Sequence, residues 1–398
     1  MALKIIFWLS AGALIFSYII YPVLLPVLSW FRKKSPPEVK LHPENTDYFP
    51  RIIILFAAHN EEKIIEKKII SVFNSDYPAE KIIVMIGSDC STDRTDDIIR
   101  NYSVKYPALN LYCFEKRTGK TGIINHLIED YRKTSHQDDI LILTDANVLF
   151  EKTTIKELVN GFSDSRVGLV GAVVQNQNNN AGISGQERAY IQRENRIKYY
   201  EGELWGAVMG AFGACYAIRP EFFPRIPANI LMEDFFVTMH VIQKKKKAII
   251  NPKAVCIEDV SVQVREEFKR KQRISAGNFQ NLSHYWRLLF RLNGVSFAFF
   301  SHKVLRWFGP FFIIGALISS AVLGVKIDFY FTLLIVQSTL LALSFAELVL
   351  QKLRITIAPL RLLFYFYAMN LALISGFFMF MRGIKSTVWS PTERQIIS

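Results

Sequence analysis

Long apolar runs without charge at both ends of the chain constrain its folding most. Residues 5–31 contain no Asp, Glu, Lys or Arg, and a helix of that length, rising about 1.5 Å per residue, exceeds the roughly 30 Å hydrocarbon core of a bilayer. This run is longer than the apolar part of a signal peptide and no small-residue cleavage site follows it, so we favour a membrane anchor. The charge-free runs at 307–325, 329–346 and 362–381 predict about three further spans within residues 304–382.

Basic residues beside these runs predict the orientation. Arg32, Lys33 and Lys34 follow the first run directly, so the positive-inside bias places the next domain in the cytoplasm. At the other end, a fourth crossing would put Arg382 and Lys385 outside, against the same bias. One C-terminal segment is therefore expected to be re-entrant or interfacial, and the sequence leaves open which. The expected location is a cell membrane, taken to be the bacterial inner membrane, with several spans.

The middle of the chain has a different composition. Residues 48–280 are polar and mixed in charge, with short apolar runs between helical patterns, which is typical of an α/β domain. We expect strands at 51–57 and 81–86, each followed by a polar loop and a helix. This order predicts a parallel sheet whose ligands bind at the carboxyl ends of the strands. Residues 281–300 then mix aromatic and basic side chains at helical spacing, which predicts an interfacial helix.

Charge and cysteine content exclude some functions. The net charge is +13, but no DNA- or RNA-binding pattern accompanies it, so we expect no nucleic-acid partner. Anionic lipid headgroups and a nucleotide diphosphate explain the charge better. Cys90, Cys113, Cys215 and Cys256 have no paired spacing, which excludes a zinc knuckle or a disulfide framework and predicts packing residues in a reducing compartment.

Polar residues follow two of the apolar runs. Asp89 comes at the end of the second predicted strand, and Asp145-Ala-Asn147 follows a third run at 139–144. Because side chains alternate along an extended chain, Asp145 and Asn147 point toward one place. Oxygen ligands at this spacing suit Mg²⁺ or Mn²⁺ bound jointly with a diphosphate. An Asp-x-Asn turn without a ligand is the more frequent case, so the triplet alone leaves both interpretations open.

Several short motifs occur in a fixed order along the chain. They are Asn60-Glu61-Glu62, Asp89-Cys-Ser-Thr-Asp93-Arg-Thr95, Arg117-Thr-Gly-Lys120 with Asn125, Thr144-Asp145-Ala-Asn147, Met232-Glu233-Asp234 and Arg270-Lys-Gln-Arg273. This set, over about residues 48–285, resembles glycosyltransferase family 2, in the membrane-integrated branch of the cellulose, hyaluronan and poly-N-acetylglucosamine synthases. The resemblance implies a GT-A-like, Rossmann-like nucleotide-sugar-binding domain with transmembrane helices on both sides.

The resemblance also implies roles for particular residues. The nucleotide-sugar contacts would be Ala58, Asn60, Glu61, Asp89, Lys120, Asp145 and Arg270. Asp145 and Asn147 would hold Mg²⁺ or Mn²⁺, and the small residues Gly210, Gly213 and Ala214 would border the acceptor. The catalytic residues would be Asp234 as general base, its neighbour Glu233, and Arg273 facing the departing diphosphate. A like charge at Glu233 tends to raise the pKa of its neighbour, and both acids also suit the N-terminus of a helix at 235–243.

Departures from the family pattern limit the expected activity. The usual Asp-x-Asp is Asp145-Ala-Asn147 here, with one carboxylate fewer, and a usual Pro is Ala58. The Gln-x-x-Arg-Trp of processive synthases keeps only Arg273, since Ile274 stands at the Trp position. Ile cannot present an aromatic face to a sugar, which argues against polymerising activity.

The sequence therefore predicts an inverting glycosyltransferase with a cytoplasmic catalytic domain. Its donor would be a nucleotide-diphosphate sugar, expected to be a UDP-sugar, and its acceptor a lipid-linked or growing polysaccharide chain at the membrane. Two alternatives remain: a processive synthase that also translocates its product, and a non-catalytic membrane scaffold on the same fold.

Overall fold

The computed structural model describes most of the chain. The described residues are 1–33, 49–175, 183–258, 264–352 and 357–384. The chain forms two compact units, one from Met1–Val27 and Gln263–Gly383, here the helical unit, and one from Leu28–Val262 and Ile384–Ser398, here the α/β unit. Lys34 and Lys385, on which the predicted orientation depends in part, lie outside the described residues.

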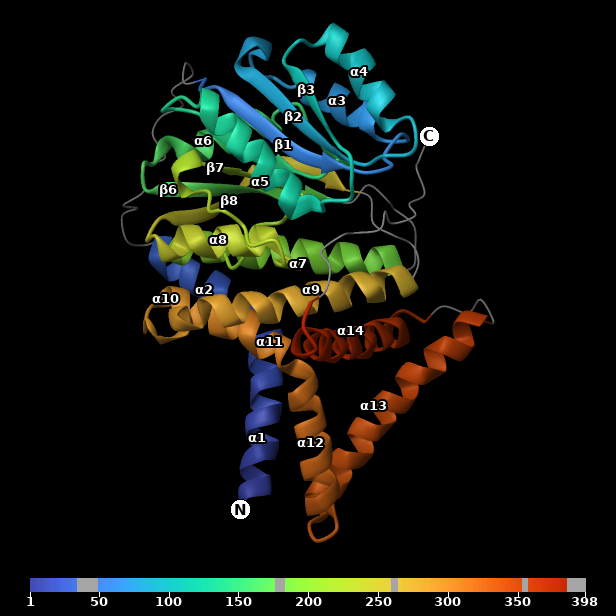
Figure 1. Ribbon diagram of the computed structural model, residues 1–398. Helices are drawn as coiled ribbons and strands as arrows, with labels where there is room; N and C mark the ends of the chain where they lie inside the picture. The colour runs from blue at the N-terminus through green and yellow to red at the C-terminus, as the bar shows by residue number, and fades with distance from the viewer. Residues whose placement is uncertain (34–48, 176–182, 259–263, 353–356, 385–398) are drawn as a thin grey trace. The chain divides into compact units, whose positions relative to one another are not determined.

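An eight-stranded sheet forms the centre of the α/β unit (Figure 1). Its strands are β1 (Ile52–Ala58), β2 (Ile82–Asp89), β3 (Leu109–Phe114), β4 (Ile140–Thr144), β5 (Val148–Phe150), β6 (Val167–Gln175), β7 (Cys215–Ile218) and β8 (Lys247–Glu258), in the order β3-β2-β1-β4-β7-β6-β8-β5. The first four in that order pair in parallel, so the predicted parallel sheet is confirmed for this half. Strand β7 runs antiparallel to both neighbours, and β5 antiparallel to β8. The complete sheet is therefore mixed.

Helices cover both faces of this sheet. They are α3 (Ile65–Phe73), α4 (Thr95–Lys105), α5 (Lys120–Tyr131), α6 (Thr154–Asn160), α7 (Ile183–Trp205) and α8 (Glu233–Gln243), with short 3-10 turns at Ala79–Lys81, Arg132–Thr134, Gly161–Ser163 and Pro220–Phe222. Alternate residues of β1 and β2 pack with α3, α4 and α6 in one apolar cluster. Gly87 belongs to the opposite face, where an added Cβ would lie 2.2 Å from Ile123 of α5. Helix α5 therefore lies close against the other side of the sheet.

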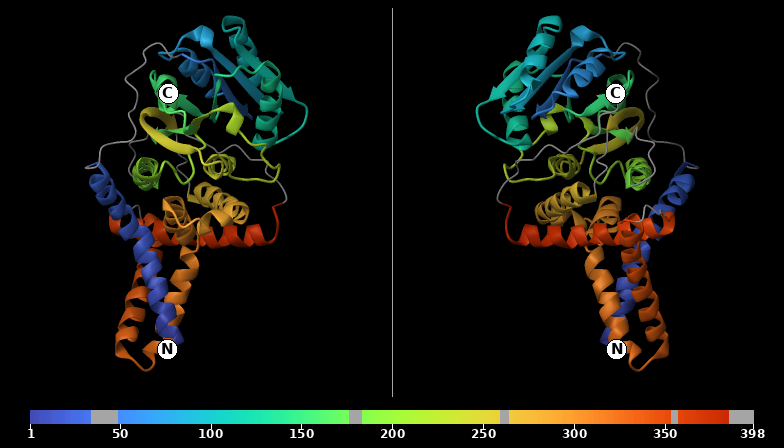
Figure 2. Two further views of the ribbon diagram at one scale, coloured as in Figure 1. Left: turned by 90° about the vertical axis from the view of Figure 1, so that its left-hand side faces the viewer. Right: turned by 90° about the vertical axis from the view of Figure 1, so that its right-hand side faces the viewer.

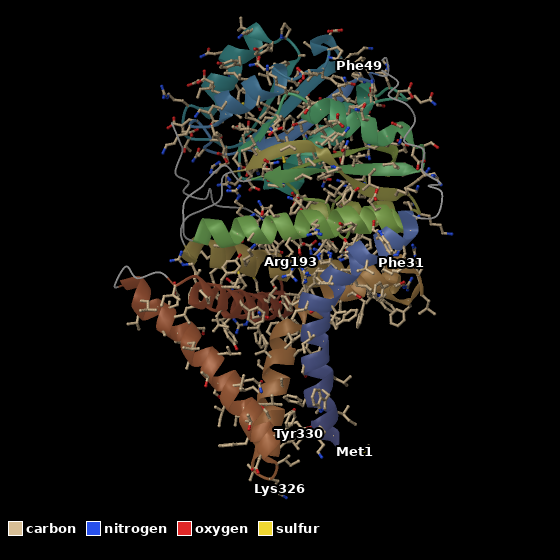
Figure 3. All side chains as sticks on the ribbon, turned by 180° about the vertical axis from the view of Figure 1, so that it is seen from behind. Met1, Phe31, Phe49, Arg193, Lys326 and Tyr330 are labelled. Carbon is tan, nitrogen blue, oxygen red and sulfur yellow. The ribbon has the colours of Figure 1, made fainter. Side chains whose placement is uncertain are left out.

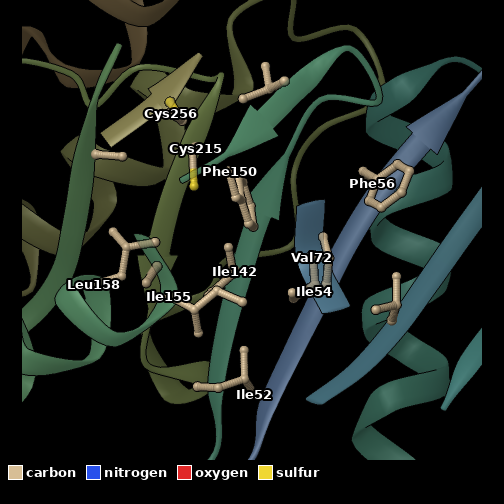
Figure 4. Close-up of a cluster of buried hydrophobic side chains, with 14 of the residues drawn as sticks. Ile52, Ile54, Phe56, Val72, Ile142, Phe150, Ile155, Leu158, Cys215 and Cys256 are labelled. Atoms are coloured by element: carbon tan, nitrogen blue, oxygen red, sulfur yellow. The ribbon is translucent and has the colours of Figure 1, made fainter. Parts of the chain in front are cut away.

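An apolar cluster lies between the sheet and helices that include α3, α4 and α6 (Figure 4). It includes Ile54 and Phe56 of β1, Val72 of α3 and Ile155 of α6, all buried. Burial of each such side chain stabilises the fold by roughly 1.5–3 kcal/mol. Cys215 and Cys256 also belong to the cluster as free thiols, so the prediction of packing residues is confirmed for these two, whereas Cys90 is half-buried and Cys113 is exposed.

The helical unit contains the apolar ends of the chain. Its helices are α1 (Ala2–Ile15), the π-helix Phe16–Ile20, the start of α2 (Tyr21–Lys33), α9 (Val264–Tyr285), the 3-10 turn Trp286–Phe290, α10 (Gly294–Ala298), the π-helix Phe299–Val304, α11 (Leu305–Trp307), α12 (Gly309–Gly324), α13 (Asp328–Lys352) and α14 (Ala358–Met381). Helix α1 packs on α12 and α12 on α13 (Figure 2). Phe7 and Tyr330 contact each other edge to face, and Met1 lies at the same end of this unit as Lys326 (Figure 3).

Several of these helices can cross a membrane. By length and composition, Ala2–Arg32, Asp328–Leu350 and Ala358–Met381 qualify among the described residues. The expected span at 307–325 is different, because Gly294–Trp307 and Gly309–Gly324 qualify only together and meet at a bend of 62°. The described chain thus has three candidate spans, or up to four if this bent pair is one broken span.

The segment expected to form one interfacial helix is divided in the structure. Helix α9 ends at Tyr285 and a 3-10 turn follows. Leu292 then has a positive φ of 50°, and Asn293 caps α10 by accepting a hydrogen bond from the Ser296 amide at 3.1 Å. Asn favours helix caps because its side chain satisfies a free backbone N–H group. The periodic pattern of aromatic and basic residues does not reveal this break.

Candidate active site

The loops after β1 and β2 are joined by hydrogen bonds at the carboxyl edge of the sheet. Asn60 has a positive φ of 53°, and its Oδ1 accepts from the Thr92 amide at 2.8 Å. The amide of Glu61 donates to Thr95 Oγ1 at 2.8 Å, and that of Glu62 to an Asp93 carboxylate oxygen at 3.1 Å. The predicted nucleotide contacts Asn60 and Glu61 thus lie in a rigid double loop.

Asp89 organises the next loop. Its carboxylate is fully buried and accepts hydrogen bonds from Arg117 Nε at 3.0 Å and from the Thr118 and Gly119 amides at 2.6 and 3.2 Å. Gly119 has a φ of 80°, a conformation that costs glycine little. Asp89 therefore holds the loop that leads into α5. Its role as a base contact stays a prediction.

Helix α5 places a lysine between two carboxylates. The Nζ of Lys120 lies 2.6 Å from Asp145, which follows β4, and 2.5 Å from Glu233 at the start of α8. Burial would lower the pKa of Lys120, but the charges of Asp145 and Glu233 raise it well above its ordinary value. The ammonium group therefore stays charged and joins three elements at the sheet edge.

Asp234 lies beside this cluster in the first turn of α8. Its side chain is 8% exposed, and the Phe235 amide donates to its Oδ1 at 2.7 Å. Burial and the charge of Glu233 raise the pKa of Asp234 to about 6, against the opposing charge of Lys120. A carboxylate with this pKa is ionised at neutral pH and is more basic than a solvated one.

Small residues before β7 make room for α8. Gly210 has a φ of 84°, and a Cβ there would lie 2.5 Å from the Phe235 ring. A Cβ on Gly213 would lie 3.0 Å from Asp234 Oδ2. The space next to Gly210 and Gly213 is thus filled by residues of α8, and Ala214 begins the entry into β7. Their contact with an acceptor stays a prediction.

The predicted metal ligands are only partly open. The side chain of Asp145 is 33% exposed, whereas Asn147 is 9% exposed and its Nδ2 has no hydrogen-bond partner in the described part of the protein. No group of three or more His, Cys, Asp or Glu suited to a metal occurs among the described residues. One accessible carboxylate fits Mg²⁺ or Mn²⁺, which are commonly bound by one or two carboxylates together with substrate phosphates. A site built entirely from protein ligands does not fit.

Sequence reasoning missed two buried polar residues near this cluster. Tyr216 of β7 is 1% exposed, and its hydroxyl has no hydrogen-bond partner in the described chain. Burial and the charges of Glu233 and Asp234 raise its pKa well above the ordinary value. Lys68 of α3 is fully buried. Of the two, only Lys68 could have been identified from the sequence, because it lies on the apolar face of the helical pattern with Ile69.

The predicted residues Arg270 and Arg273 belong to the helical unit, on α9. Arg270 Nη1 lies 3.4 Å from Glu267, one turn earlier on the same helix. In the same unit Gln272 Nε2 donates to Ser375 Oγ of α14 at 2.6 Å. The roles of Arg270 and Arg273 toward the diphosphate stay predictions.

Comparison with known proteins defines the class. The family profile described as glycosyl transferase family 21 matches residues 15–371. The chain belongs to this family and is a glycosyltransferase, so the predicted enzyme class is confirmed and the scaffold alternative is not supported.

The predicted family was wrong. The match to family 21 overturns the resemblance to family 2 and to the cellulose and hyaluronan synthases. The motifs on which it depended are short, oxygen-rich loops at strand ends. Sheets of this kind place such loops where ligands bind, so these loops indicated the chemistry but did not identify the family.

Individual relatives are distant. The chain is 26% identical over 265 residues to a beta-monoglucosyldiacylglycerol synthase of Synechocystis sp., which covers 64% of this chain and 53% of that protein. The chain thus spans about half the length of this curated relative. It is 23% identical over 315 residues to a dolichyl N-acetyl-alpha-D-glucosaminyl phosphate 3-beta-D-2,3-diacetamido-2,3-dideoxy-beta-D-glucuronosyltransferase of Methanococcus voltae, covering 74% of this chain and 89% of that one.

A solved structure shares the fold. The mannosyltransferase PcManGT of Pyrobaculum calidifontis, in complex with GDP-Man and Mn²⁺, superposes with a TM-score of 0.70 at 21% identity. The match covers 95% of this chain and 99% of that one. The expectation of an α/β, Rossmann-like fold with apolar helices at both ends is confirmed at this level, although the sheet is mixed and not wholly parallel.

Proposed function

We propose that this protein is an inverting glycosyltransferase that transfers a sugar from a nucleotide-diphosphate donor to a lipid-linked or glycolipid acceptor at a membrane. The observation that carries the proposal is the cluster at the carboxyl edge of the sheet. There a buried acid, Asp234, lies beside the ion pairs that Lys120 makes with Asp145 and Glu233. Within the proposal, residues 48–280, which include most of the α/β unit and part of α9, are a catalytic domain of the GT-A type.

Asp234 would act as the general base. It would accept the proton of the acceptor hydroxyl as the hydroxyl oxygen bonds to the anomeric carbon, while the bond from that carbon to the phosphate oxygen breaks. A base is most effective when its pKa lies near the working pH. The pKa of about 6 for Asp234 is therefore better suited to this step than the ordinary value of a carboxyl group.

Lys120 and Asp145 would bind the donor diphosphate. Lys120 carries a permanent charge that can neutralise a phosphate oxygen. Asp145, with Asn147, would hold Mg²⁺ or Mn²⁺, which would neutralise the charge that develops on the leaving diphosphate. Arg270 and Arg273 are further candidates for this contact.

The donor base and the acceptor are inferred from relatives. The structure of PcManGT holds GDP-Man and Mn²⁺, so a GDP-sugar is a second candidate donor in addition to the UDP-sugar expected from the sequence. The names of these two relatives contain a diacylglycerol and a dolichyl-linked sugar phosphate, which favours a lipid acceptor. The candidate spans fit this acceptor, and Arg32 with Lys33 favours a cytoplasmic catalytic domain.

The test is release of nucleotide diphosphate from a panel of UDP- and GDP-sugars. Detergent-solubilised full-length protein would be supplied with membrane lipid extract as acceptor, with and without Mn²⁺ or Mg²⁺. We expect metal-dependent release with one donor, reduced about 10²- to 10⁴-fold in Asp234→Asn because a general base contributes that much. The exposed acid Glu221 supplies the control Glu221→Gln. No release from any donor, or an active Asp234→Asn, would contradict the proposal.

A further inference from the structure

Lys68 is a buried charged side chain that the proposed reaction does not use. It is fully buried in α3, on the face that carries Ile65, Ile69 and Val72 into the apolar cluster. Phe56 and Phe150, which Figure 4 labels within this cluster, have ring centroids 5.5 and 3.8 Å from its Nζ. Among the residues that the structure describes, no carboxylate forms an ion pair with it.

The ammonium group of Lys68 contacts both ends of one turn. Its Nζ donates to Thr144 Oγ1 at 3.1 Å and to the Val148 carbonyl oxygen at 2.6 Å. Thr144 is the last residue of β4 and Val148 the first of β5. The residues between them include Asp145 and Asn147, so Lys68 closes the turn that carries both predicted metal ligands.

The same contacts continue to the segment beside the proposed base. Thr144 Oγ1 accepts from Lys68 and donates to the Ala214 carbonyl oxygen at 2.7 Å. Ala214 follows Gly213, whose Cα approaches Asp234 so closely that a Cβ would lie 3.0 Å from its Oδ2. One chain of hydrogen bonds therefore links the Asp145 turn to the backbone against which Asp234 lies.

Stability does not explain a lysine at this position. An ammonium group buried without a carboxylate is costly, so an apolar side chain in its place removes that cost and offsets the loss of the two hydrogen bonds. Burial lowers the pKa of Lys68 to about 8, against smaller opposing effects from its surroundings. A costly group whose two hydrogen bonds both go to the ends of one turn is better explained by what it does to that turn.

We propose that Lys68 is a positioning residue, which holds the Asp145 turn in place for the donor diphosphate by binding Thr144 and Val148 from inside the core. This inference rests on the proposed function, because it assigns the diphosphate to that turn. It predicts that loss of the ammonium group loosens the turn and weakens nucleotide binding without unfolding the protein.

The test compares Lys68→Met, which keeps the length of the side chain and removes its donors, with Lys67→Met on the exposed side of α3. Thr144→Val is the second variant, since it removes the accepting hydroxyl at nearly the same shape. Hydrogen exchange of the amides from Ile140 to Phe150 would be measured on full-length protein, together with the unfolding temperature. Binding of GDP and of UDP, each with Mn²⁺, would be measured by calorimetry.

We expect Lys68→Met to keep its unfolding temperature while the amides of the turn exchange about tenfold faster, as loss of a hydrogen bond to a charged group implies. The Kd for the nucleotide that the wild type binds should rise by about the same factor. Unchanged exchange and an unchanged Kd would overturn the inference.

The two proposals fail in different ways. If the wild type binds neither nucleotide, the proposed function fails, and hydrogen exchange still decides whether Lys68 holds the turn. If Lys68→Met does not fold, Thr144→Val decides: faster exchange at the turn supports the role of Lys68, and wild-type exchange overturns it.

Discussion

Two lysines lie near the Asp145 turn in opposite electrostatic surroundings. Lys120 has two carboxylates within 2.6 Å and a pKa well above its ordinary value. Lys68 has a hydroxyl, a carbonyl and an aromatic ring around it, and its pKa is lowered to about 8. One lysine therefore pairs with carboxylates at the sheet edge, and the other donates hydrogen bonds to a hydroxyl and a backbone carbonyl within the core. The proposed roles of the two lysines, in binding the diphosphate and in positioning the turn, therefore differ because the partners of their ammonium groups differ.

The largest expected effect tests the lysine at the sheet edge. Lys120→Met leaves the charges of Asp145 and Glu233 without their shared cation, and it removes the proposed phosphate contact. We expect the Kd for a nucleotide diphosphate to rise roughly thirtyfold, which corresponds to about 2 kcal/mol for one partner of a charge pair. Calorimetry would measure it, with the exposed Lys116→Met as control.

The same variant sharpens the contrast with Lys68. Since Lys120 is 23% exposed, we expect its loss to cost about 1 kcal/mol of unfolding free energy, less than a fully buried pair. Lys68→Met should cost less than this, because removal of a buried charge offsets the loss of its hydrogen bonds to Thr144 and Val148. Equal destabilisation by the two variants would show that both lysines serve mainly to stabilise the fold.

The second expected effect is the dependence of activity on pH. The pKa of Asp234 is raised to about 6, so the base is ionised above that pH and protonated below it. The value of kcat/KM should therefore rise with pH through about 6, and be about tenfold lower at pH 5 than on the plateau. Glu233→Gln removes a like charge and should shift this rise in kcat/KM to lower pH. If the rise stays at the same pH, Asp234 is not the titrating group.

The smallest expected effect concerns Asn147, which stands where an Asp-x-Asp motif would have its second carboxylate. Asn147→Asp adds a charge beside Asp145, and metal affinity increases with ligand charge. We expect the half-saturating Mn²⁺ concentration for donor binding to fall on the order of threefold. The exposed Asn160→Asp is the matched control. A rise in the half-saturating Mn²⁺ concentration would indicate that Asn147 packs within the turn and does not bind the ion.

Sequence periodicity predicted much of the parallel half of the sheet. The runs at 51–57 and 139–144 are β1 and β4 to within one residue at each end, and the run at 81–86 is β2, which continues to Asp89. A buried parallel strand needs a continuous apolar run. The same apolar runs locate Asp89 and Asp145 at the ends of two of these strands. Periodicity missed β3 (Leu109–Phe114), in which only Leu109 is buried and the other residues are partly or fully exposed.

The sequence by itself determined that the chain has apolar ends, an α/β middle and acidic residues at strand ends, since these follow from local composition and period. Only the tertiary structure decided that Lys120 lies between Asp145 and Glu233 and that Lys68 lies beneath the turn. Those contacts join α3, α5, α8 and β4, which are far apart in the chain and meet only when the sheet assembles. The pKa of Asp234 depends on the burial and charge that this assembly creates, which no local pattern encodes.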